Sequence, residues 1–158
     1  MSMTYAINFW SSSSIDSIAS KIVDHFGFSM DPTHCGRSPT VKTITLLKNN
    51  LVLDIQEVQE SIQDFYALEL DVKVNRFILI SPGSLFTSMS DDSEMIVSIV
   101  CEILQSESGD LVMLFLGEFV ILMRKDQKLI IDESYDFWNS RNEAALTIPH
   151  TSEALPSL

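Results

Sequence analysis

The chain has 158 residues, of which 46% are hydrophobic and 20% are charged. This length fits one domain with a substantial core, and the hydrophobic content excludes a chain that is disordered throughout. Twenty-two acidic residues against ten basic ones give a net charge of −12, which argues against nucleic acid or anionic lipid as a partner, because both require clustered Lys and Arg.

The first half of the chain is predicted to hold strands and one amphipathic helix. Apolar residues recur at helical spacing from Ile15 to Phe26, behind serines that suit a helix N-cap and before Gly27, which suits a helix end. Runs rich in β-branched and aromatic residues predict strands on either side. The predicted strands are residues 4–10, 41–48 and 51–58, with a loop at 28–39 and either a short helix or an irregular loop at 59–71.

The second half is predicted to be a strand, an apolar helix and three closely spaced strands. Residues 111–116 are apolar at every position, so both faces of this strand are expected to be buried and the strand is expected to lie inside the sheet. Gly117-Glu118 and Asp126-Gln127 suit the turns between the last strands. The predicted elements are strands at 72–80, 110–116, 119–124 and 128–132, with helices at 90–106 and 140–146.

Together these elements predict an α+β fold with a single antiparallel sheet of about six strands. The predicted order is β-α-β-β-β-α-β-β-β, with two main helices packed on one face, because short connections favour antiparallel neighbours. Residues 1–150 are predicted to form one domain and residues 151–158 a flexible C-terminal tail. The chain starts without a signal-peptide pattern and has no apolar stretch of about 20 residues, so we expect a cytoplasmic protein that does not enter the membrane.

No arrangement of residues typical of catalysis stands out. His34-Cys35 places two donor atoms side by side, but a zinc site needs a second pair at suitable spacing. Cys101 lies in an apolar run and is expected to be a buried small hydrophobe. The five glycines are isolated, which argues against a phosphate-binding loop. We expect no enzyme activity, metal or cofactor; a small hydrolase with an unrecognised site is one alternative.

Nearly all of the net charge lies in the middle of the chain. Residues 49–123 carry thirteen acids and two bases, and either solubility or a surface for a basic protein accounts for them. The densest run, residues 54–71, contains no base. Its acids and two aromatic residues are the candidate partner-binding residues, although core packing also accounts for the aromatic pair. They are Asp54, Glu57, Glu60, Asp64, Phe65, Tyr66, Glu69 and Asp71.

A longer pattern runs from Asp91 to Trp138. It consists of an apolar helix, the run GDLVMLFLGEFVILMRKDQKLIID at 109–132 and DFW at 136–138. This pattern resembles the C-terminal half of the Sit-type immunity proteins, bacterial proteins that protect a cell from its own swarming-inhibition toxin, which is delivered by contact between kin. The resemblance implies a non-enzymatic cytoplasmic inhibitor that binds a toxin domain tightly.

The sequence thus predicts a cytoplasmic immunity protein that neutralises a cognate, basic toxin through an acidic surface, as a monomer or weak dimer. The alternative is an acidic dimeric secretion chaperone that binds an extended effector segment. Such chaperones are also small and acidic, and the wide apolar stripe of the helix at 90–106 would suit a dimer interface.

Overall fold

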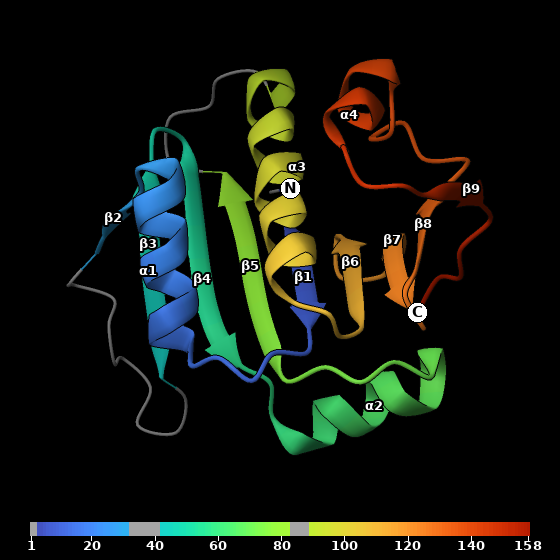
Figure 1. The fold of residues 1–158 in the computed structure, drawn as a ribbon, viewed down its shortest axis with the longest axis horizontal. Helices are drawn as coiled ribbons and strands as arrows, with labels where there is room; N and C mark the ends of the chain where they lie inside the picture. Colours follow the sequence, from blue (N-terminus) through green and yellow to red (C-terminus); the bar gives the residue numbers. More distant parts are fainter. Residues whose placement is uncertain (1–2, 32–41, 83–88) are drawn as a thin grey trace.

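The computed structural model describes residues 3–31, 42–82 and 89–158, and shows an α+β fold built on one nine-stranded sheet (Figure 1). The strands lie in the order β2-β3-β4-β5-β1-β6-β7-β8-β9. Their bounds are β1 Tyr5–Phe9, β2 Ser29–Met30, β3 Thr43–Lys48, β4 Leu51–Glu57, β5 Arg76–Pro82, β6 Leu111–Phe115, β7 Phe119–Lys125, β8 Lys128–Asp132 and β9 Thr151–Glu153. The helices are α1 Ile15–Phe26, α2 Glu60–Leu70, α3 Met89–Ser106 and α4 Ser140–Ala145.

The sheet is mixed, so the predicted antiparallel sheet of about six strands was wrong in number and in direction at one edge. Every neighbouring pair is antiparallel except β8 and β9, which run parallel. The connection between these two strands contains α4 and is long enough for a parallel return. The prediction missed β2, which has two residues, and β9, which has three, because neither is long enough to show a strand pattern.

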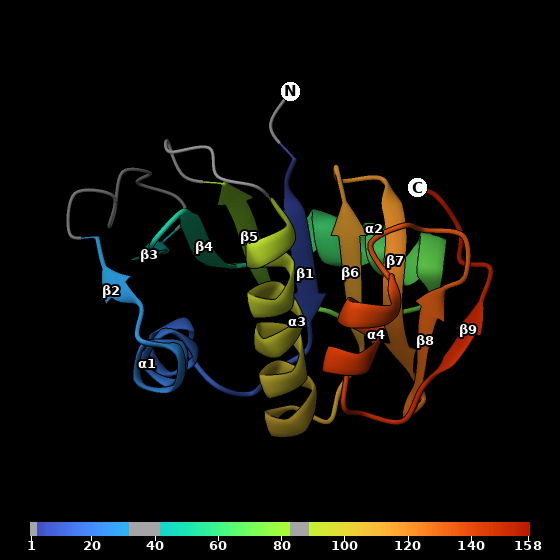
Figure 2. The same cartoon turned by 90° about the horizontal axis from the view of Figure 1, so that it is seen from above.

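Helices cover both faces of the sheet, whereas two helices on one face were predicted. α1, α3 and α4 lie on one face and α2 lies on the other (Figure 2). The predicted bounds of the first helix are confirmed: the Ser14 hydroxyl accepts a hydrogen bond from Ser17 N, and Gly27 ends the helix at φ 74°. Residues 59–71, where the sequence allowed a helix or a loop, contain α2.

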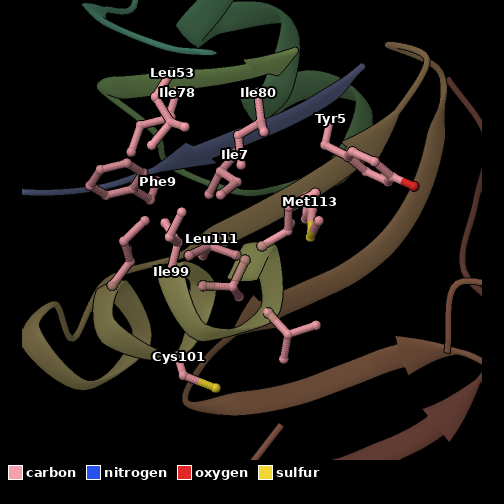
Figure 3. Close-up of a cluster of buried hydrophobic side chains, with 14 of the residues drawn as sticks. Tyr5, Ile7, Phe9, Leu53, Ile78, Ile80, Ile99, Cys101, Leu111 and Met113 are labelled. Atoms are coloured by element: carbon pink, nitrogen blue, oxygen red, sulfur yellow. The ribbon is translucent and has the colours of Figure 1, made fainter. Parts of the chain in front are cut away.

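The larger core lies between one face of the sheet and the helices α1, α3 and α4 that cover it. Tyr5, Ile7 and Phe9 of β1 point into it, as does Cys101 of α3, which confirms that this cysteine is buried (Figure 3). The apolar stripe of α3 also faces this core. Its buried members are Ile96, Val97, Ile99, Val100, Cys101, Ile103 and Leu104. This stripe is therefore packed within the molecule and is not free to form the dimer interface that the chaperone alternative suggested for it.

A smaller core lies on the opposite face, beneath α2. Ala6 of β1 and Val112 and Leu114 of β6 are buried there against Tyr66 of α2 and Val74 of the segment that follows the helix. The two central strands are thus buried on both faces. The prediction that residues 111–116 lie inside the sheet is confirmed.

The buried guanidinium of Arg124 ties β7 to the end of α3. Its Nε donates to Gly109 O at 2.9 Å, and its two terminal nitrogens donate to Leu104 O at 2.7 Å and Glu107 O at 2.6 Å. The last carbonyls of a helix lack hydrogen-bond donors within the helix, and the Arg124 side chain provides such donors here. Burial lowers the pKa of Arg124. The chain packs closely where α3 leads into β6, because a Cβ on Gly109 would lie 2.7 Å from the Cβ of Trp10.

Replacing Arg124 by Met should lower the free energy of unfolding by about 2–4 kcal/mol, because buried carbonyls lose a charged donor. Urea denaturation followed by circular dichroism measures the loss. Lys128→Met is the control, since it removes an exposed ammonium 3.3 Å from Glu153 and should cost less than about 1 kcal/mol. Equal losses in the two variants would contradict this role for Arg124.

Asp132, at the end of β8, holds the C-terminal residues. Its carboxylate accepts hydrogen bonds from Ser134 N at 2.9 Å, Ser134 Oγ at 2.7 Å and Leu155 N at 2.8 Å. Burial acts to raise the pKa of Asp132, but these hydrogen bonds outweigh burial and keep the pKa below its usual 3.8. Residues 151–158, predicted as a flexible tail, thus contain β9 and a backbone amide bonded to this carboxylate.

We expect this attachment to weaken in acid. Because the pKa of Asp132 is lowered in the folded state, the ionised carboxylate stabilises the fold above about pH 4 and its contribution is lost as the pH falls through the lowered value. Protection of the Leu155 amide from hydrogen exchange should therefore decrease between about pH 6 and about pH 3. Asp132→Asn should remove most of this pH dependence. Protection that stays constant in the unmodified protein would show that the carboxylate does not hold this segment.

Candidate functional site

α2, which contains most of the candidate partner-binding residues, is attached to the sheet by a narrow stripe. Tyr66 is buried, Gln63 and Leu70 are half-buried, and every other side chain of the helix is exposed. The Tyr66 hydroxyl accepts a hydrogen bond from Asn8 Nδ2 at 3.1 Å, and Gln63 Nε2 donates to Val58 O at 2.8 Å. Burial raises the pKa of Tyr66, against the smaller opposing effect of the Asn8 hydrogen bond.

Removing the Tyr66 hydroxyl should loosen α2. Tyr66→Phe leaves the buried Asn8 amide without its acceptor, which should cost about 1–3 kcal/mol of unfolding free energy. Urea denaturation measures this cost, and hydrogen exchange shows whether α2 opens first. Tyr135→Phe is the matched control at a half-buried tyrosine whose ring packs at a tilt against Phe115 and Phe119. A Tyr66→Phe variant as stable as this control would contradict the anchoring role.

The acids of α2 lie on its exposed surface. Glu60 and Asp64 are four residues apart and therefore share one flank of the helix, and Glu69 lies on the other flank, with Phe65 and Leu68 between them. The helix sequence contains no Lys or Arg. α2 therefore presents three solvent-exposed carboxylates without a base of its own.

The other three candidate acids are not residues of α2, although Glu57 and Asp71 are also exposed to solvent. Asp54 is half-buried on β4, Glu57 ends that strand, and Asp71 ends α2 with a left-handed φ of 55°. Their partners are Thr45 Oγ1 for Asp54 at 2.6 Å, Arg76 for Glu57 at 4.0 Å, and Lys125 for Asp71. Six acids that are close in sequence are thus divided between the surface of α2 and hydrogen bonds or ion pairs with other elements of the fold.

The two candidate aromatic residues point in different directions. Tyr66 is 7% exposed and packs in the smaller core, whereas Phe65 is 44% exposed. The structure adds two residues that the sequence reasoning did not single out: Ile62 is 45% exposed and Leu68 is 82% exposed. Ile62, Phe65 and Leu68 are spaced at i, i+3 and i+6, which places all three along one side of the helix. This spacing indicates a shared surface only if residues 59–71 form a helix, which the sequence left open.

A groove of about 290 Å³ lies between the start of α2 and the sheet. Asn8, Gln56 and Phe77 line its sheet side, and Ile62 and Tyr66 line its helix side. None of its lining residues is a lysine or an arginine. The groove joins the exposed side of α2 through Ile62, so the helix and the groove form a continuous surface.

The described histidines make contacts away from this surface. His25 Nε2 lies 3.7 Å from Glu102 Oε2, between α1 and α3, and His150 Nδ1 lies 2.8 Å from Ile148 O. The His34-Cys35 pair lies outside the described residues. Within residues 3–31, 42–82 and 89–158, no group of three or more His, Cys, Asp or Glu side chains is placed to hold a metal ion. No helix in the described part of the chain is long and apolar enough to cross a bilayer.

A family model described as SitI3-like matches residues 85–142, just over a third of the chain. The matched segment holds α3, β6, β7 and β8 and the beginning of α4, and is the same region whose sequence resembles the Sit-type immunity proteins. No curated protein and no solved structure matches the chain. The match is consistent with a Sit-type immunity protein, and α2 lies outside it.

Proposed function

We propose that this protein is a cytoplasmic immunity protein that binds and neutralises a cognate bacterial toxin. The observation that carries this proposal is the SitI3-like match over residues 85–142. In this proposal the protein acts by binding alone, without catalysis, metal or cofactor. The match covers α3, β6, β7 and β8 and does not reach α2, so the contact surface proposed below is argued from the structure and the charge of the chain.

The proposed contact surface is the exposed side of α2 with Glu60, Asp64 and Glu69. Two observations support it: these carboxylates have no base on their own helix, and they belong to the segment that carries most of the net charge. An acidic surface accelerates encounter with a basic partner and disfavours acidic ones. We therefore propose a basic toxin, bound by a monomer or weak dimer of this protein.

The experiment that tests the function starts from capture with the tagged full-length protein in a lysate of its own organism. A captured protein should stop growth when it is expressed alone in a sensitive host, and co-expression of this protein should restore growth. The proposal fails if no captured protein is toxic or if co-expression gives no rescue. Recovery of an extended secretion substrate on a dimer would favour the chaperone alternative instead.

Electrostatic attraction predicts that charge reversal on α2 slows association with the toxin. Asp64→Lys should lower the association rate constant about threefold or more at low salt, and raising the salt from about 0.1 M to about 1 M should remove most of the difference as the Debye length shortens. Surface plasmon resonance measures both rates.

Asp24→Lys is the matched control for that measurement. It makes the same charge change at an exposed position of α1, on the face of the sheet opposite α2 (Figure 2). Equal slowing by both variants would mean that only net charge matters. A rate that does not respond to salt would exclude electrostatic steering.

A further inference from the structure

We infer that the centre of the toxin contact is an apolar ridge on α2, formed by Ile62, Phe65 and Leu68, and that this ridge fits an apolar patch bordered by basic residues on the partner. This inference rests on the proposed function. It goes further by assigning the affinity to side chains that carry no charge.

The exposure of these three side chains is unusual within the described part of the chain. The large hydrophobic residues that are exposed there number five, and three of them lie on α2. Leu68, at 82%, is more exposed than any of the others. Single exposed apolar residues are common on protein surfaces, but a contiguous group bordered by polar residues marks an interaction site.

The ridge continues into the groove. Ile62 belongs to the ridge and also lines the groove, whose floor is formed by sheet residues that include Gln56 and Phe77. The surface thus combines a raised strip with a hollow beside it. Central apolar or aromatic residues next to a recess that excludes water carry most of the binding energy in many protein interfaces.

The charges around the ridge decide between a toxin and a second copy of this chain. Glu60 and Asp64 border the ridge on one flank and Glu69 borders it on the other, and the nearby Lys125 is already paired with Asp71. Two copies that met through this face would place acids against acids in molecules of charge −12, which is unfavourable. A partner with bases around an apolar patch satisfies both kinds of side chain.

The ridge and the acids should affect different rate constants. Exposed charges act at long range and govern association, whereas a buried apolar contact acts only in the formed complex and governs dissociation. Phe65→Ala and Leu68→Ala should therefore each raise the dissociation rate constant about tenfold or more, with little change in the association rate constant. Both side chains are exposed, and alanine favours a helix, so the fold should be retained.

The test measures binding of these variants to the toxin obtained by the capture and rescue experiment. Met30→Ala is the control, because Met30 is 50% exposed on β2, at the edge of the sheet far from α2 (Figure 1). Gln59→Trp is a further variant; it places a large side chain at an exposed position that lines the groove and should weaken binding by obstructing the groove. Circular dichroism and urea denaturation confirm that each variant is folded.

Faster dissociation of the ridge variants, with Met30→Ala unchanged, would support the inference. Ridge variants that bind and neutralise the toxin like the unmodified protein would overturn it while the proposed function stands. If no toxin is captured and neutralised, the proposed function fails and the inference fails with it. Sedimentation of the isolated protein tests whether a second copy of this chain binds the ridge. A dimer that Phe65→Ala dissociates would assign the ridge to a second copy and overturn the inference.

Discussion

The central strands β1 and β6 carry apolar side chains on both faces, so neither face of the middle of the sheet can be left in water. Exposing apolar surface costs about 25 cal/mol per Å², and the rest of the fold is arranged to avoid this cost. α3, with α1 and α4, covers one face, and α2 covers Ala6, Val112 and Leu114 on the other. The same requirement that places α2 over the second face leaves its outer side free.

α2 therefore has two separate sides. Tyr66 and its hydrogen bond to Asn8 attach the inner side to the sheet, while the outer side carries acids and exposed apolar residues that make no contribution to either core. A helix fixed by a few buried contacts keeps its outer side chains in a defined arrangement, which reduces the entropy lost when a partner binds. The segment similar to the SitI3-like family supplies only part of the surface beneath this helix, through Val112 and Leu114 of β6.

Several elements were predictable because their signals are local. The apolar spacing of residues 15–26 and the serine and glycine at its ends are sufficient to predict α1. Leu51, Leu53 and Ile55 stand at alternate positions, which is typical of a strand with one buried face, and all three are buried in β4. β2 and β9 were not predictable, because two or three residues carry no periodicity and their pairing depends on neighbours distant in sequence. The segment at 59–71 was ambiguous because its apolar residues do not gather on the single face expected of a helix on one core.

The sequence by itself determined the α+β class, most of the helices and strands, the acidity of the middle of the chain and the resemblance of its C-terminal half to the Sit-type immunity proteins. Only the tertiary structure decided that α2 lies on the opposite face from the other helices, that Tyr66 is buried while Phe65 is exposed, and that Asp54 and Asp71 are bonded to Thr45 and Lys125 of other strands. These outcomes depend on which elements meet in space. Periodicity and charge are read along the chain, whereas burial and exposure are set by residues far apart in it.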